Sequence, residues 1–135
     1  MDRVFLDANV LFSVAYTPAS RLRTLWSLRD VELITSLYAA EEARRNLRAH
    51  RPSAVQDLED LLAQIRLVAG VPADIPGGIE LPEKDLPIIV AAAAARCTHL
   101  LTGDSRHFGA YYGKDILGVT VLTPAQYLQN RMDRA

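Results

Sequence analysis

Residues 4–16 read VFLDANVLFSVAY, a stretch in which a short apolar run ends at an aspartate and a helical pattern follows. The run Val4 to Leu6 is short enough for a buried strand, and the apolar residues from Asn9 to Tyr16 have helical spacing. A strand followed directly by a helix is the unit from which parallel sheets are built. This stretch therefore predicts an α/β fold with Asp7 at the junction.

The same alternation continues along the chain. Further strands are predicted at 31–35, 66–69, 99–102 and 118–122, and helices from 20, over 37–48, over 55–65, over about 83–96 and from 123. Two of these helix starts carry a capping-box pattern, Ser53 with Gln56 and Thr123 with Gln126. Glycines and prolines without periodicity predict a loop over 70–82. We expect a small α/β/α three-layer sandwich with a mostly parallel sheet, similar to the Rossmann fold.

The length of 135 residues predicts a single domain over 1–135, and half of the residues are hydrophobic, as in globular proteins. Cys97 is the sole cysteine and cannot form an internal disulfide, which favours a reducing compartment. The N-terminus lacks the pattern of a signal peptide, and the longest apolar run, 86–95, is well short of the roughly 20 residues that span a bilayer. We expect a soluble cytoplasmic protein.

The balance of charged residues argues against one class of function, strong non-specific binding of nucleic acid. The formal net charge is −1, whereas proteins that grip duplex nucleic acid without specificity carry a clear basic excess. An enzyme that acts on a nucleic acid remains compatible with this charge.

Four carboxylates are predicted to meet at one edge of the sheet. Sites in open α/β sheets lie beyond the carboxyl ends of the strands. Asp7 ends the first strand and Asp104 follows the fourth, while Glu42 and Asp85 lie near the starts of helices that begin at that edge. Carboxylates gathered in this way repel one another unless a cation lies between them.

A hard divalent cation is the expected partner of such a group. Mg²⁺ and Mn²⁺ prefer oxygen ligands, and either can polarise a phosphoryl oxygen and lower the pKa of water. The three histidines have no zinc-site spacing, and the chain has neither a phosphate-binding P-loop nor a Gly-x-Gly-x-x-Gly motif.

Each carboxylate also has a simpler interpretation. Asp85 precedes Pro87 and could cap a helix, Glu42 could be a solvated residue beside Glu41, and Asp104 could belong to an ordinary turn. Asp7 fits such an interpretation least well, because it closes an apolar strand and needs a partner.

Four segments together resemble the PIN-domain family of metal-dependent ribonucleases, many of which are toxins of toxin–antitoxin pairs. They occur in family order and cover nearly the whole chain: VFLDANVL at 4–11, TSLYAAEE at 35–42, DLPIIVAAA at 85–93 and LLTGDSRHF at 100–108. The fourth is the most specific, because it is similar to the family's Thr-Gly-Asp-x-x-His-Phe.

The resemblance implies which residues hold the metal and act in catalysis: Asp7, Glu42, Asp85 and Asp104. The register from Ser36 favours Glu42 over Glu41, although helical periodicity alone does not decide between them. The family often has a further acid after the last motif, where this chain has Ser-Arg-His at 105–107. The resemblance also implies an RNA substrate, a homodimer and a cognate antitoxin protein.

Other residues near these motifs receive supporting roles. Asn9 and Thr102 are expected to orient the carboxylates by hydrogen bonds, or else to cap local backbone. The basic stretch Arg44, Arg45, Arg48 and Arg51 could contact RNA phosphates or form a solvated helix face. His107 and Phe108 are expected to pack beneath the site rather than act in it.

The leading hypothesis is a Mg²⁺- or Mn²⁺-dependent endoribonuclease. A non-catalytic RNA- or partner-binding module on the same fold is the alternative, and the presence of all four acids disfavours it. A receiver-like phosphoacceptor domain ranks third, because Asp7 has no paired acid and the chain contains only Lys84 and Lys114 as lysines.

Overall fold

The computed structural model describes residues 1–69 and 81–134, and a six-stranded sheet forms its centre. The strand order is β3-β2-β1-β4-β6-β5, and all pairings are parallel except that of β5 with β6. The strands are β1 (Asp2–Leu6), β2 (Val31–Ser36), β3 (Arg66–Val68), β4 (His99–Leu101), β5 (Asp115–Ile116) and β6 (Val119–Leu122). The predicted mostly parallel α/β sheet is confirmed, and β5 is a strand that the sequence did not predict.

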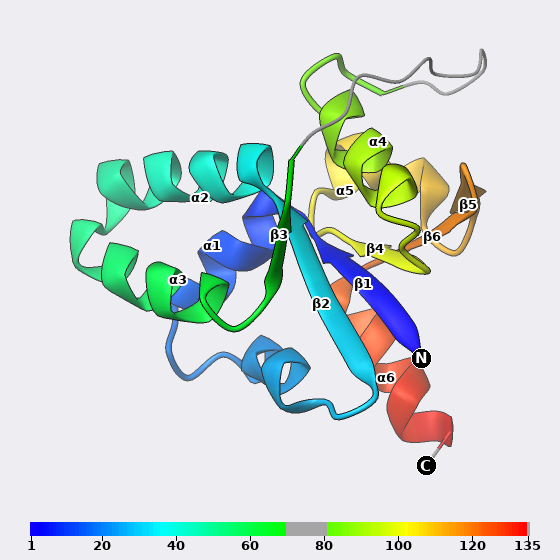
Figure 1. The fold of residues 1–135 in the computed structure, drawn as a ribbon, viewed down its shortest axis with the longest axis horizontal. Coiled ribbons are helices and arrows are strands. Elements are labelled where there is room, and N and C mark those ends of the chain that lie inside the picture. The colour runs from blue at the N-terminus through cyan, green and yellow to red at the C-terminus, as the bar shows by residue number, and fades with distance from the viewer. Residues whose placement is uncertain (70–80, 135) are drawn as a thin grey trace.

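Helices cover the sheet on both sides. They are α1 (Ala8–Tyr16), α2 (Leu37–His50), α3 (Val55–Leu62), α4 (Leu86–Ala94), α5 (Ser105–Phe108) and α6 (Pro124–Arg134), with 3-10 helices η1 (Arg21–Ser27), η2 (Pro52–Ala54) and η3 (Gly109–Tyr111). Figure 1 shows α1, α2 and α3 on one side of the sheet and α4 and α5 on the other. The three-layer arrangement is the predicted one.

The central strands of the sheet are buried. Phe5 in β1 lies opposite Ile34 of β2 and Leu100 of β4, and all three side chains are fully buried. A strand buried on both faces needs an apolar residue at every position rather than alternation, which explains the unbroken apolar run at the start of the chain.

Several helices begin where strands end, and side chains at those junctions cap them. The Asp7 carboxylate accepts a hydrogen bond from the backbone N–H of Ala8, and the Ser36 hydroxyl accepts one from Ala39. Caps of this kind satisfy backbone donors that have no partner within the helix. Polar residues are thereby concentrated at the carboxyl edge of the sheet.

Some predicted elements differ from those observed. The helix expected from Ser20 is the 3-10 helix η1, and the helix expected over about 83–96 is the shorter α4. Most of the predicted loop over 70–82 lies outside the described residues. Within the described ranges, no helix has both the length and the apolar character needed to cross a bilayer.

Candidate active site

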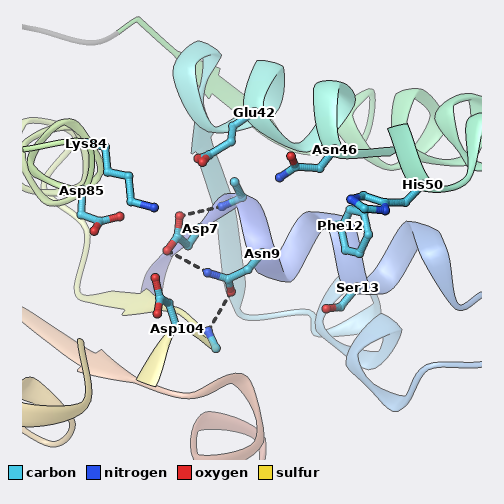
Figure 2. Close-up of a pocket in the computed structure, with 12 residues that line it drawn as sticks. Asp7, Asn9, Phe12, Ser13, Glu42, Asn46, His50, Lys84, Asp85 and Asp104 are labelled. Carbon is cyan, nitrogen blue, oxygen red and sulfur yellow. Dashed lines mark hydrogen bonds between the residues drawn. The ribbon is translucent and has the colours of Figure 1, made fainter. Parts of the chain in front are cut away.

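A cleft of about 540 Å³ opens at the carboxyl edge of the sheet, between α1, α2, the start of α4 and the loop after β4. All four predicted carboxylates line it: Asp7, Glu42, Asp85 and Asp104. Figure 2 shows these side chains converging from separate segments of the chain. The topology therefore brings together residues that are far apart in the sequence.

Asp7 is the most firmly held of these acids. Its Oδ1 accepts a hydrogen bond from Ala8 N at 2.7 Å, and its Oδ2 accepts from Thr102 Oγ1 at 2.8 Å and Asn9 Nδ2 at 3.1 Å. Burial raises the pKa of Asp7 to about 6, with smaller contributions from the nearby Glu42 and Asp85, while the bonds from Thr102 and Ala8 act in the opposite direction. The carboxylate is thus fixed in orientation and ionises above its usual range.

Asn9 and Thr102 make the hydrogen bonds expected of them and also join two segments. Asn9 donates to Thr102 Oγ1 at 3.1 Å and accepts from the backbone N–H of Gly103 at 2.7 Å. Thr102, which is fully buried, also accepts from the backbone N–H of Asp104 at 3.1 Å. This network ties the junction of β1 and α1 to the loop that carries Asp104.

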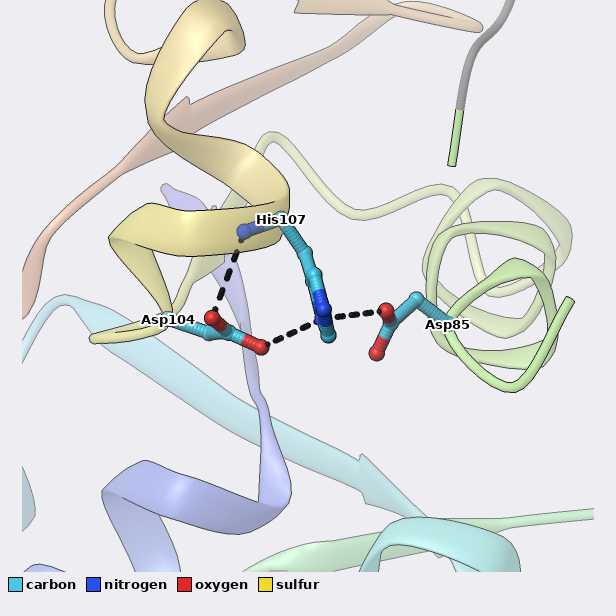
Figure 3. A group of neighbouring side chains, drawn as sticks. All are labelled: Asp85, Asp104 and His107. Carbon is cyan, nitrogen blue, oxygen red and sulfur yellow. Dashed lines mark hydrogen bonds and ion pairs between the residues drawn. The ribbon is translucent and has the colours of Figure 1, made fainter. Parts of the chain in front are cut away.

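Asp85 and Asp104 form a second group around His107. The His107 Nδ1 atom lies 2.8 Å from Oδ2 of Asp85 and 2.8 Å from Oδ2 of Asp104 (Figure 3). Asp85 occupies the N-cap position of α4 but makes no side-chain capping bond, so the capping interpretation fails for its carboxylate. Burial raises the pKa of Asp85, and His107 and Lys84 partly counteract that effect.

The structure corrects the prediction for His107. The ring was expected beneath the site, but its Nδ1 lies between two of the predicted metal ligands, whereas Phe108 is fully buried as expected. Both contacts are close yet poorly directed, and Asp85 Oδ2 and His107 Nδ1 are buried without a hydrogen-bond partner. One ring nitrogen carries at most one proton, so it cannot satisfy both carboxylates.

The donor set fits a metal ion. One ligand atom from each of Asp85, Asp104 and His107 lies within 4.8 Å of the others, which makes this group a possible metal site. The carboxylates of Asp7 and Glu42 line the same cleft. Oxygen-rich donor sets of this kind are typical of Mg²⁺ and Mn²⁺ sites.

Glu42 and Glu41 point in different directions. Glu42 lines the cleft, whereas Glu41 is exposed and forms ion pairs of 3.6 Å with Arg44 and 3.5 Å with Arg48. Glu42 is also close enough to Asp7 to raise its pKa. The geometry thus favours Glu42 as the member of this site.

A comparison of the sequence with models of protein families decides the family. The model of the PIN domain matches residues 3–106, which is most of the chain and includes all four candidate acids. The chain belongs to the PIN domain family.

Solved structures share the fold of this PIN domain at low sequence identity. VapBC2 from Rickettsia felis bound to a DNA fragment from its promoter aligns with a TM-score of 0.62 at 13% identity, covering 90% of this chain and 98% of that one. VapBC-1 from nontypeable Haemophilus influenzae gives 0.62 at 14%, covering 91% and 98%. VapC20 from Mycobacterium tuberculosis, described as a Sarcin-Ricin loop cleaving toxin, gives 0.60 at 11%, covering 79% and 94%. The PIN domain is therefore structurally like VapC toxins. A comparison with the sequences of curated proteins found no match.

The predicted RNA-contacting arginines of the PIN domain lie outside the cleft. The Arg44 Nε atom is 2.6 Å from Glu59 on α3, and Arg48 is paired with Glu41. Arg51 donates to the carbonyl oxygen of Tyr16. Arg45 is exposed, and no ion pair involves it within the described part of the chain. A role in RNA contact stays a prediction for these residues.

Several cleft residues of the PIN domain were missed from the sequence. Phe12 and Ser13 of α1, Asn46 and His50 of α2, and Lys84 before α4 also line it. Glu42, Asn46 and His50 are spaced four residues apart, so they lie on one face of α2. This spacing was a usable signal once Glu42 was assigned to the site.

Proposed function

We propose that this PIN domain is a metal-dependent endoribonuclease that hydrolyses RNA phosphodiester bonds and acts as the toxin of a toxin–antitoxin pair. The observation that carries the proposal is the convergence of Asp7, Glu42, Asp85 and Asp104 on one cleft. Membership of the PIN family and the structural likeness to a toxin described as cleaving the Sarcin-Ricin loop support it.

Asp7, Asp85 and Asp104 are the residues that would hold Mg²⁺ or Mn²⁺, with Glu42 completing the acidic set. The buried Oδ2 atom of Asp85 has no well-directed hydrogen bond and is contacted by His107 Nδ1 at 2.8 Å, which supports a role for this oxygen as a cation ligand. When bound, the metal supplies Lewis acidity that polarises a phosphoryl oxygen and lowers the pKa of water.

The protein's own groups position the reactants. Thr102 and Asn9 fix the Asp7 carboxylate, so no reorientation of this group is needed during the reaction. With a pKa of about 6, Asp7 is mostly ionised at neutral pH. Glu42 faces the cleft from α2, and we assign to it the role of general base that accepts a proton from the attacking water.

The proposal includes two protein partners. The structures from Rickettsia felis and Haemophilus influenzae are VapBC complexes, and we propose that this chain likewise binds a cognate antitoxin and forms a homodimer. Light scattering should give twice the chain mass at micromolar concentrations, and a monomer would remove the dimer from the proposal. Co-purification with the product of a neighbouring small gene tests the antitoxin.

The decisive experiment is cleavage of a mixed RNA pool with Mg²⁺ or Mn²⁺, with and without EDTA. Asp104→Asn keeps the side-chain shape but removes one negative charge, and we expect a rate at least about a hundredfold lower. Asp60→Asn is the matched control, because Asp60 is exposed on α3 outside the cleft. If the wild type cuts no RNA, or Asp104→Asn cuts as fast, the nuclease proposal fails and the binding-module alternative replaces it.

A further inference from the structure

The cleft has a second end that the carboxylates do not use. Phe12 and Ser13 of α1 and Asn46 and His50 of α2 line it, on the far side of Asp7 from Asp85 (Figure 2). These side chains offer an aromatic ring, a hydroxyl, an amide and an imidazole. None of these four side chains belongs to the acidic group, yet they share one continuous cleft with it.

The aromatic ring at this end is held in place by its neighbours. Phe12 stacks on Tyr16 with ring centroids 5.3 Å apart and an interplanar angle of 27°. The His50 ring meets Phe12 edge-on, with centroids 6.2 Å apart and an angle of 88°. The Arg51 guanidinium lies 5.3 Å from the centroid of the Tyr16 ring and donates to the Tyr16 carbonyl. The cleft thus contains a pre-ordered aromatic surface, which reduces the entropy lost when a ligand binds.

We propose that the Phe12–His50 end of the cleft binds an unpaired nucleobase of the RNA substrate, next to the phosphate that is cut. Proteins that recognise single-stranded RNA stack its bases on aromatic side chains and bind the base edges through hydrogen bonds. Phe12 provides the stacking surface, and the Asn46 amide can both donate to and accept from a base edge. This inference rests on the proposed function, because it assigns one subsite of the same substrate.

The geometry also explains how the two ends cooperate. Asp7 and Glu42 lie between the aromatic end and Asp85, so a phosphate bound at the carboxylates would be next to a base held against Phe12. The acidic end repels phosphate until a cation is bound, whereas stacking needs no metal. Base recognition can therefore be measured separately from cleavage.

The test measures binding in EDTA by fluorescence anisotropy, with fluorescein-labelled hexaribonucleotides of A, C and U and a hexamer of abasic ribose phosphate. The wild type should bind at least one base-bearing hexamer about fivefold or more tightly than the abasic hexamer. Phe12→Leu keeps an apolar side chain without a π face and should abolish that difference, while Phe12→Tyr keeps the ring and should retain it. Asn46→Ala should change the ranking of the three bases, and an unchanged ranking would refute the base-edge contact assigned to Asn46.

Two results would overturn the inference: no base preference in the wild type, or a preference that survives in Phe12→Leu. Thermal melting checks that Phe12→Leu is folded, and the exposed Asn46 gives a second variant that does not disturb packing. A protein that binds bases but cuts no RNA with metal refutes the proposed function alone. A protein that cuts RNA but binds without regard to Phe12 refutes the base subsite alone.

Discussion

Asp7 and the pair Asp85–Asp104 share one cleft but are held in different ways. Asp7 accepts three hydrogen bonds from neutral donors that belong to its own junction and to Thr102. The other two carboxylates approach a single nitrogen of His107, which cannot satisfy both. Neutral donors of the fold fix the first carboxylate and also bind Oδ1 of Asp104, which accepts from the backbone N–H of His107 at 3.3 Å, whereas Oδ2 of Asp85 and Oδ2 of Asp104 depend on a positively charged or proton-donating partner.

Asp7 and Asp85 also differ in which groups offset the effect of burial on their pKa. Burial raises the pKa of both Asp7 and Asp85. Hydrogen bonds from Thr102 and Ala8 offset this effect for Asp7, and charges on His107 and Lys84 offset it for Asp85. In the proposed metal site, Asp7 is therefore a rigid ligand, whereas Asp85 and Asp104 are ligands whose electrostatic balance changes when a cation binds.

The largest effect is expected from Asp7→Asn. The substitution removes the charge of the rigid ligand while keeping its shape, so RNA cleavage should slow by about a hundredfold to a thousandfold. Initial rates with Mg²⁺ or Mn²⁺ measure it, and Asp133→Asn on α6 is the control. A rate equal to that of the wild type would exclude Asp7 from the site.

The second prediction concerns stability against pH without metal. The pKa of Asp7 is about 6 in the folded protein against 3.8 for an unperturbed aspartate, so the folded state binds this proton more tightly. The stability that the folded state has through the protonated Asp7 carboxyl is fully present below about pH 4 and is lost as pH rises through about 6. This loss lowers the free energy of unfolding by on the order of 3 kcal/mol.

Urea unfolding at pH 4, 5, 6 and 7 in EDTA tests whether the free energy of unfolding falls as pH rises. The decline should be clear in the wild type and much smaller in Asp7→Asn, which cannot ionise. Equal slopes in the two proteins would show that Asp7 does not ionise in this range.

The third prediction concerns the pair Asp85–Asp104. His107→Ala removes the group that lies between Asp85 and Asp104, and the metal-free protein should lose about 1 to 2 kcal/mol of stability. In the proposed site the carboxylates hold the cation and His107 occupies the space between Asp85 and Asp104 in its absence, so the gain in melting temperature on adding Mg²⁺ or Mn²⁺ should be larger than in the wild type. Arg106→Ala, on the same short helix, is the control. An unchanged metal-free stability would mean that His107 does not balance the two carboxylates.

The smallest effect is expected from Thr102→Val, which keeps the volume of the buried side chain but removes its hydroxyl. Asp7 then loses one of its three donors, and cleavage should slow by about fivefold, near 1 kcal/mol. The pH at which stability declines should move upward, because Thr102 lowers the pKa of Asp7. A variant with unchanged rate and pH dependence would show that Asn9 and Ala8 suffice.

Alternation of apolar runs and helices was enough to predict the sheet except for β5. That strand has two residues, Asp115 and Ile116, which do not form an apolar run. It is connected to β6 by Leu117 and Gly118, whose φ angles are 53° and 84°. Such tight hairpins usually show Asn-Gly or Asp-Gly, and leucine at a positive φ gives no comparable signal.

The two predicted capping boxes show how local patterns depend on context. Thr123 and Gln126 exchange both expected hydrogen bonds, each at 3.0 Å. Ser53 instead lies inside η2, Ala54 takes the N-cap position of α3, and the Gln56 amide donates to Asp60. The Pro52 turn ahead of α3 displaces the pattern from the helix start.

Most of the acidic site was predictable because its geometry follows from topology. Asp7 and Asp104 follow strands that run in the same direction, so their proximity needs no knowledge of side-chain packing. His107 was missed because its role depends on Asp85, which approaches only through the packing of α4. The Phe12–His50 end was missed because it requires the contact between α1 and α2.

Two faces of α2 have different roles, and this separation bears on how the protein can adapt. Ala39, Ala40, Ala43 and Leu47 are buried against the rest of the fold, while Asn46 and His50 are exposed in the cleft. Positions 46 and 50 can therefore change without repacking the interior or moving Glu42. If the proposed function holds, a lineage could exchange one RNA target for another through these two positions while the acidic residues that act in cleavage stay unchanged.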